Sequence, residues 1–271
     1  PEDSGKEWLK LLKVKLFCYN KARGIPVRIV GRGSNLLIRD GGIRGAVIHP
    51  AGGAFAAVTV EGNTITAGVG VRFKKVASIA REHGIGGFEW MEGIPGNVGG
   101  GLRMNAGAMG VETFDQVVAV TFLDEDGEIR TRKRDEIKFY YRNVPELRRN
   151  YALEATFAGF PSDQQAIQEK LNESRHHRNT TQPKAASAGC TFKNPAVCGA
   201  GQLIDEMGLK ETGVGKAEVS PEHGNFIVNR GKASASDVIS LIETIKAKAK
   251  EDRGVVLETE IQILGEDEVV F

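Results

Sequence analysis

Four stretches of the chain predict helices, three of them from apolar residues at the spacing of an amphipathic helix and the third in chain order as a surface helix. They lie at residues 6–22, at 73–84, at 164–178 and from Ser234 onward. Gly24 and Pro26 stop the first pattern, and Gly84 stops the second. The third has a basic end, SRHHR, which suits the negative end of a helix dipole. Ser234 with Asp237 three residues later is a capping box for the fourth helix.

Apolar and polar residues alternate with the period of a β-strand in other stretches. Residues 26–31 predict a strand, and the runs within 47–70 predict a hairpin that turns at Glu61-Gly62-Asn63. Residues 116–122 and 127–131 predict a second hairpin, and 255–264 predict a closing strand. Helices and antiparallel strands in this order indicate an α+β protein.

Charge and cysteine content narrow the class of protein. The 271 residues include 36 basic and 35 acidic ones, so no overall field recruits nucleic acid or a membrane surface. Charges interrupt each apolar run well short of a membrane span, and no signal peptide opens the sequence. Three cysteines without a CxxC pair favour reduced thiols and a cytoplasmic location. We expect no metal site, and a monomer is compatible with the sequence.

Two glycine-rich patches, residues 31–45 and 93–110, predict the binding site. The second has seven glycines in eighteen residues, which argues against a packed helix or strand. Backbone without Cβ atoms can bring its N–H groups against a flat or anionic ligand, and two such patches suit a dinucleotide. The alternative is a pair of ordinary turn-rich loops. Neither patch has the P-loop pattern, and neither has GxGxxG opening a helix.

Five motifs carry a resemblance to a known family. In chain order they are GRGSNLLIRDGG, GIPGNVGGGLRMNAGAMGVE, YYRN, SAGCTFKNP and GVVLETEIQILG. Together they resemble the UDP-N-acetylenolpyruvoylglucosamine reductase (MurB) family, flavoenzymes that make UDP-N-acetylmuramate for bacterial peptidoglycan. The resemblance runs from about Pro26 to about Gly265. The short interval between Arg142 and Cys190 is similar to the shorter, type II form, which lacks a tyrosine-bearing loop.

The resemblance implies an α+β fold with two domains. A two-lobed FAD-binding domain of the PCMH/vanillyl-alcohol-oxidase type would cover residues 1–160, with lobes at about 1–49 and 50–160. A C-terminal α+β substrate-binding domain would cover residues 161–271, and its last strand is a candidate for returning to the FAD domain. Family members usually begin with a further strand before the first helix, so we assign no cofactor contact to such a strand.

The implied reaction uses NADPH to reduce FAD, after which the flavin gives a hydride to the vinyl carbon of UDP-N-acetylglucosamine enolpyruvate. Cys190 stands where many members have a serine as proton donor, and a thiol with an ordinary pKa of about 8.5 can fill that role. Arg142 corresponds to the arginine that stabilises the enolate oxygen. Glu260 matches the catalytic glutamate that orients Arg142 or shares the proton chain. Alternation leaves Glu258 and Glu260 on one strand face, so spacing alone does not choose between them.

The resemblance also implies binding residues. The expected cofactor-binding residues are Gly31, Arg32, Gly33, Ser34, Asn35, Leu36, Gly93, Ile94, Pro95, Gly96, Val98, Gly99, Gly100, Asn105 and Gly107. Those expected for the nucleotide-sugar substrate are Tyr141, Lys193, Asn194 and His223. For Lys193, Asn194 and His223, the alternative is a local structural hydrogen bond.

Two other functions compete with the reductase. A related FAD-dependent oxidase of a hydroxy acid or sugar would share the glycine patches, but it has no reason to combine Arg142, Cys190 and Glu260. A non-catalytic nucleotide-sugar or flavin binding protein is the other alternative, which the cysteine at position 190 makes conceivable. Flavin that stays oxidised with NADPH and substrate would favour the binding protein.

Overall fold

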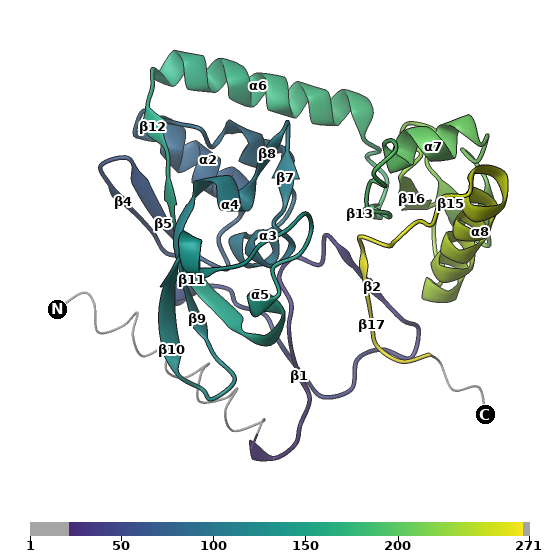
Figure 1. Cartoon of the computed structure of the whole chain (residues 1–271), viewed down its shortest axis with the longest axis horizontal. Coiled ribbons are helices and arrows are strands. Elements are labelled where there is room, and N and C mark those ends of the chain that lie inside the picture. Colours follow the sequence, from purple (N-terminus) through teal and green to yellow (C-terminus); the bar gives the residue numbers. More distant parts are fainter. Residues whose placement is uncertain (1–21, 268–271) are drawn as a thin grey trace. The chain divides into compact units, whose positions relative to one another are not determined.

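The computed structural model describes residues 22–267, which divide into two compact units (Figure 1). Unit 1 consists of residues 22–32 and 45–176, and unit 2 of residues 33–44 and 177–267. The helix expected over residues 6–22 lies, but for its last residue, outside the described part, as does Cys18.

Unit 1 is built on a five-stranded antiparallel sheet with the strand order β10-β9-β11-β5-β4. Its strands are β4 (Val58–Glu61), β5 (Thr64–Gly68), β9 (Val117–Leu123), β10 (Ile129–Lys133) and β11 (Tyr151–Ala158). The pairs β4–β5 and β9–β10 are the two expected hairpins, which are therefore confirmed. In the first, Gly62 takes a φ of 56°, the left-handed conformation that the turn requires.

Helices cover this sheet and bury its core. Unit 1 contains α2 (Phe73–Glu82), α3 (Val98–Met104), α4 (Thr113–Gln116), α5 (Glu146–Arg149) and the first part of α6 (Gln164–Thr181), which continues into unit 2. The apolar stripe of α2 is buried as expected, and Gly84 follows its end with a φ of 65°. The ring of Phe73 packs 5.6 Å from that of Trp90 in the core.

Short pairings and turns complete unit 1. Strand β1 (Val27–Ile29) pairs in parallel with β3 (Ala46–Ile48). Strand β1 lies within residues 26–31, where a strand was expected. Two further antiparallel pairs are β6 (Ile85–Gly86) with β12 (Phe160–Pro161), and β7 (Gly107–Ala108) with β8 (Val111–Glu112). The 3-10 turns are η1 (Gly53–Ala56), η2 (Glu89–Gly93) and η3 (Arg134–Glu136).

Unit 2 has a four-stranded antiparallel sheet with the order β13-β16-β15-β14. Its strands are β13 (Ser187–Cys190), β14 (Gly213–Val214), β15 (Ala217–Val219) and β16 (Phe226–Asn229), and its helices are α7 (Ala200–Glu206) and α8 (Ala235–Arg253). The Ser234 hydroxyl accepts a hydrogen bond from the Asp237 N–H, which confirms the expected capping box of α8. Leu241, Ile242 and Ile245 of α8 are fully buried in this unit's own core.

Residues 33–44 belong to unit 2, although the sequence groups them with the first FAD lobe. Strand β2 (Leu36–Ile38) pairs in parallel with the last strand, β17 (Gln262–Leu264). The Asp40 carboxylate accepts from the N–H groups of Ala235 and Ser236 at 2.7 and 2.9 Å, at the start of α8. The described units therefore divide at residues 32, 44 and 176, not at the expected boundary of 160.

The closing strand is shorter than the expected 255–264. Strand β17 has only three residues, and before it the chain makes a single bridge between Thr259 and Phe192. Leu257 and Ile261 are buried and lie an even number of residues apart, and Glu258 between them is exposed, so the burial pattern agrees with the period-two alternation that places the two glutamates on one face.

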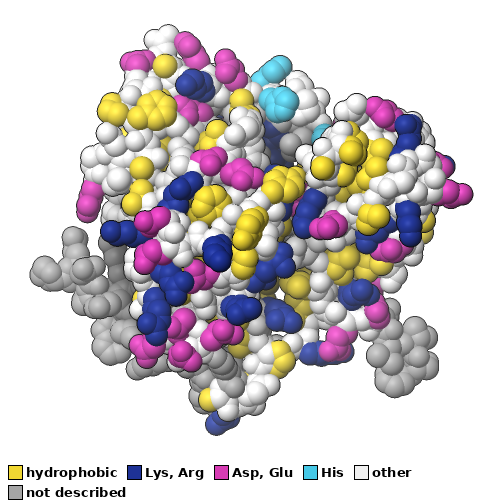
Figure 2. All heavy atoms as spheres, viewed as in Figure 1, with side chains coloured by type: hydrophobic (Ala, Val, Ile, Leu, Met, Phe, Trp, Pro, Cys, Tyr) yellow, Lys and Arg dark blue, Asp and Glu magenta, His cyan; other side chains and the backbone are white. Residues whose placement is uncertain are grey.

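Within residues 22–267, no helix combines the length and apolar character that crossing a membrane requires. On the face that Figure 2 shows, basic and acidic side chains are intermixed, which agrees with the net charge of +1.

Candidate active site

The two glycine patches meet in unit 1 at Asn97. A Cβ atom added to Gly31 would lie 3.9 Å from the Asn97 Cβ, and one added to Gly100 would meet nothing within 4 Å. Asn97 is 5% exposed, yet its side-chain oxygen has no hydrogen-bond partner. A buried polar atom without a partner is costly. Asn97 was not among the expected cofactor-binding residues, because an asparagine among glycines is typical of an ordinary turn.

Other glycines of the second patch have structural roles. Residues 98–104 form helix α3, so the argument that this patch cannot serve a packed helix is wrong. A Cβ atom at Gly101 would come within 2.1 Å of the Phe73 ring, and one at Gly99 within 2.9 Å of the Val69 Cβ. At Gly107 it would lie 2.4 Å from the Val111 carbonyl oxygen across the β7–β8 hairpin. These glycines allow close packing.

The entry to α3 is held by backbone bonds. The Phe73 N–H donates to the Gly96 carbonyl at 3.2 Å, and the N–H of Val98, which is fully buried, donates to Val71. Gly93 ends η2, and Ile94 closes it through a bond from its N–H to the Met91 carbonyl. Pro95 and Arg32 are exposed.

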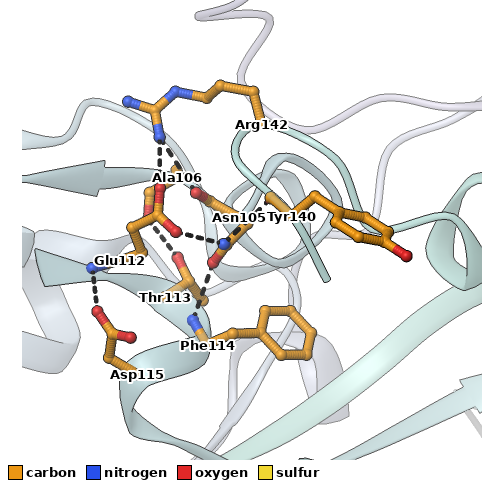
Figure 3. A network of polar contacts seen from close by, with 8 residues as sticks. All are labelled: Asn105, Ala106, Glu112, Thr113, Phe114, Asp115, Tyr140 and Arg142. Carbon is orange, nitrogen blue, oxygen red and sulfur yellow. Dashed lines mark hydrogen bonds and ion pairs between the residues drawn. The ribbon is translucent and has the colours of Figure 1, made fainter. Parts of the chain in front are cut away.

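Asn105, at the other end of α3, is held entirely within the protein (Figure 3). It is fully buried and takes a left-handed φ of 42°. Its side-chain oxygen accepts from the Phe114 N–H at 3.0 Å, and its amide nitrogen donates to Glu112 at 2.7 Å and to the Tyr140 carbonyl at 3.3 Å. The Asn105 side chain therefore has a structural role, because it links the end of α3 to Glu112, Phe114 and Tyr140.

Arg142 lies in a tight turn of unit 1. Tyr140 and Asn143 close the turn with reciprocal backbone bonds of 2.8 and 3.1 Å, and Arg142 has a φ of 54° at the third position. Its guanidinium donates to the Asn105 carbonyl at 3.2 Å and lies 4.7 Å from the ring centre of Tyr141. This arrangement presents a permanent positive charge from a nearly buried side chain.

Unit 2 brings the other two expected catalytic residues to one place. The Glu260 N–H donates to the carbonyl of Thr191, the residue after Cys190, at 2.8 Å. The Asn35 side chain donates to the Glu260 carbonyl at 3.2 Å, and the Ser34 carbonyl oxygen lies 3.4 Å from a Cβ built on Gly189. Gly189 has a φ of 83°. The first glycine patch thus lies against the segments that carry Cys190 and Glu260.

Asn225 fixes the segment after Cys190, and sequence reasoning missed it. Its side chain accepts from the Phe192 N–H and donates to the Phe192 carbonyl, both at 2.8 Å, in a fully buried position. Its own carbonyl accepts from the Thr191 N–H at 2.8 Å. The GNF sequence around Asn225 carries no local signal for this role, because both partners lie far away in the chain.

Arg178, near the end of α6, is also close to Cys190. Burial lowers the pKa of Arg178, and the neighbouring Cys190 acts in the opposite direction. At the basic end of this helix, Arg178 therefore interacts electrostatically with Cys190, a candidate catalytic residue. The sequence pattern predicted only that basic residues stabilise the C-terminus of the helix.

The structure distinguishes the two glutamates of the last segment. Glu258 is exposed and its carboxylate pairs with the Lys193 ammonium at 2.8 Å, which lowers the pKa of Glu258. Glu260 is half-buried next to the Cys190 segment. Lys193, which was expected to bind substrate, is thus the ion-pair partner of Glu258, the glutamate that was not expected to be catalytic.

Two further substrate candidates make structural hydrogen bonds. The Asn194 side chain accepts from the Ala200 N–H at 3.0 Å, at the start of α7. The His223 ring accepts from the Asn225 N–H at 3.1 Å and packs edge-on against Phe226. Burial lowers the pKa of His223, so the ring favours its neutral form.

Comparisons with known proteins match both parts of the chain. A model of the FAD binding domain matches residues 14–132, and a model of the C-terminal domain of UDP-N-acetylenolpyruvoylglucosamine reductase matches residues 182–264. The reductase of Bradyrhizobium sp. (strain ORS 278) is 41% identical over 242 residues, which is 89% of this chain and 79% of that protein. The reductase of Clostridium novyi (strain NT) is 42% identical over 249 residues, or 91% and 80%.

A solved structure is similar over the same extent. The crystal structure of the reductase (MurB) from Thermus caldophilus superposes with a TM-score of 0.80 and 35% identity. The superposition covers 90% of this chain and 88% of that one. The first matched range contains both glycine patches, and the second contains Cys190 and Glu260. Arg142 lies in the sequence between the two matched ranges.

Proposed function

The chain belongs to the UDP-N-acetylenolpyruvoylglucosamine reductase family and is a flavin-dependent oxidoreductase with an FAD-binding domain, and on this premise we propose its reaction. It reduces UDP-N-acetylglucosamine enolpyruvate to UDP-N-acetylmuramate with NADPH, in the bacterial cytoplasm, as a step of peptidoglycan synthesis. What supports this most directly is the unit 2 arrangement, in which Cys190 and Glu260 lie on adjacent segments against Ser34 and Asn35.

The residues present fit FAD. In unit 1, the backbone at Gly100 is open where a side chain would otherwise stand, Gly31 lies beside Asn97, and the buried oxygen of Asn97 needs a donor. In unit 2, Gly33 has a φ of 72° and open space where a Cβ would be. Flat rings and phosphates approach such backbone closely, and the donors of a flavin or ribose can satisfy Asn97. When bound, FAD takes electrons from NADPH and supplies them to the substrate as a hydride.

The side chains supply the acid and the charge that this reduction needs. Hydride addition at the vinyl carbon leaves negative charge on the neighbouring carbon and its carboxylate. Arg142 stabilises that charge with its planar, positively charged guanidinium. The Cys190 thiol gives the proton to the neighbouring carbon, and Glu260 orients Arg142 or shares the proton chain with Cys190.

The test follows the flavin spectrum of the purified, FAD-loaded protein without oxygen. NADPH should bleach the flavin, and UDP-N-acetylglucosamine enolpyruvate should restore its colour. Cys190→Ala should keep the bleaching and slow the restoration about 10²–10⁴-fold, while Cys190→Ser keeps much of it. Cys198→Ala, at another half-buried cysteine of unit 2 outside any disulfide, is the matched control and should behave as the unaltered protein.

Other outcomes point elsewhere. If NADPH bleaches the flavin and only oxygen restores it, the protein is an oxidase. If the flavin stays oxidised with NADPH and substrate, the protein binds without catalysis. A protein that takes up no FAD at all contradicts the flavoenzyme assignment.

A further inference from the structure

The conformation of Arg142 needs support from outside its own turn. A φ of 54° is uncommon for a residue with a side chain, and backbone bonds between Tyr140 and Asn143 close the turn. A long, charged side chain also loses rotamer freedom when it is held in one place. Groups that fix both the turn and the Arg142 guanidinium therefore determine the position of its positive charge.

Glu112 contacts both through its two carboxylate oxygens. One oxygen accepts from the Asn105 amide at 2.7 Å, and that amide also donates to the Tyr140 carbonyl of the turn. The other oxygen lies 3.6 Å from the Arg142 guanidinium. Figure 3 shows the Arg142 side chain directed toward Glu112 and the Asn105 carbonyl together.

Glu112 is itself held in place by contacts that do not involve Arg142. It ends β8, precedes α4, and donates its own N–H to the Asp115 carboxylate at 2.8 Å. Its side chain is 33% exposed, against 16% for Arg142. At 3.6 Å the ion pair is longer than a hydrogen bond, so Glu112 acts on the guanidinium through its charge.

We infer that Glu112 is a positioning residue for Arg142: with Asn105 it fixes the turn and the direction of the guanidinium. The inference rests on the proposed role of Arg142 in stabilising the developing charge of the substrate. Stabilisation of that kind depends on charges that are already in position when the reaction starts. Loss of the Glu112 charge therefore slows the step in which substrate is reduced, and it leaves the reduction of flavin by NADPH unaffected.

Glu112→Gln is the sharpest perturbation, because it keeps an acceptor for Asn105 and removes the charge that faces Arg142. Stopped-flow absorbance of the FAD-loaded enzyme measures the two half-reactions separately. Reoxidation of reduced flavin by UDP-N-acetylglucosamine enolpyruvate should slow about tenfold, with flavin reduction by NADPH and the thermal unfolding midpoint unchanged. Glu112→Asp keeps the charge and should recover part of the rate.

The matched control is Glu146→Gln in the same unit. Glu146 pairs with Arg132 at 2.7 Å, and its side chain is 15% exposed. This substitution removes an ion pair whose partner is Arg132 and not Arg142, so both half-reactions should keep their rates. If Glu112→Gln slows both half-reactions equally or lowers the unfolding midpoint, Glu112 has only a structural role and the inference is overturned.

A double-mutant cycle separates the two claims. Arg142→Ala alone should slow reoxidation by substrate, and adding Glu112→Gln to it should cost less than a further twofold, because the partner is already missing. If Arg142→Ala reoxidises at the original rate, the proposed function of Arg142 fails. If Arg142→Ala is slow while Glu112→Gln is fast, or the two effects multiply in full, Arg142 keeps its role and Glu112 loses its own.

Discussion

Asn225 holds the segment that follows Cys190, and its replacement by alanine measures how far that segment depends on it. The substitution removes both side-chain bonds to Phe192, whose N–H and carbonyl belong to a fully buried residue. Each buried backbone group left without a partner costs about 1–3 kcal/mol, so the pair costs about 2–6 kcal/mol. That is a large share of the about 5–15 kcal/mol that stabilises a typical domain.

Native-state hydrogen exchange of Asn225→Ala localises this loss. The amide of Phe192 should exchange faster by the equivalent of about 2–6 kcal/mol in its opening free energy. Asn229→Ala is the control, because Asn229 also accepts two backbone bonds, from Gly231 and Ala233, but in an exposed position where water replaces them. It should lose less than about 1 kcal/mol. Equal losses in the two variants would refute the argument from buried bonds.

Four further substitutions test the binding and folding roles. Asn97→Leu should weaken FAD binding about tenfold, measured by flavin fluorescence, without lowering the stability of the FAD-free protein; unchanged affinity would remove Asn97 from the site. Hydrogen bonds from Ser236 and Ala235 hold the pKa of Asp40 below its ordinary value of about 3.9, so the unfolded chain binds more protons. The stabilisation is therefore present above that value and lost as pH falls through the folded pKa, and urea unfolding of Asp40→Asn should lack this acid-range dependence. Gly101→Ala, which meets the Phe73 ring, should destabilise the FAD-free protein by about 1–3 kcal/mol, whereas Gly100→Ala, which meets nothing, should not destabilise it and should weaken FAD binding.

Local signals predicted the elements whose causes lie within a few residues. The hairpin at Gly62 needs one residue with positive φ between two alternating runs, and the start of α8 needs Ser234 and Asp237 three apart. The stripe of α2 and the glycine after its end have the same character. In each case the neighbours along the chain supply the partner, so the sequence alone is enough.

Long-range pairing could not be predicted in this way. Strand β2 joins β17 at the other end of the chain, and Asp40 caps α8, which places residues 33–44 in unit 2. Both contacts depend on partners that local sequence does not reveal. The last segment changes partner from Phe192 to β2, so only its final three residues form a strand.

The candidate site shows the same limit at two asparagines that flank one helix. Asn105 was expected to bind cofactor, but Phe114, Glu112 and Tyr140 take up every polar atom of its side chain. Asn97 was not expected to, yet its oxygen is buried with no partner. Residue type is identical, so the difference lies in which backbone groups the fold brings near each side chain. A buried oxygen that the protein itself leaves unpaired is better explained by a bound ligand than by packing, because burial without a partner costs stability.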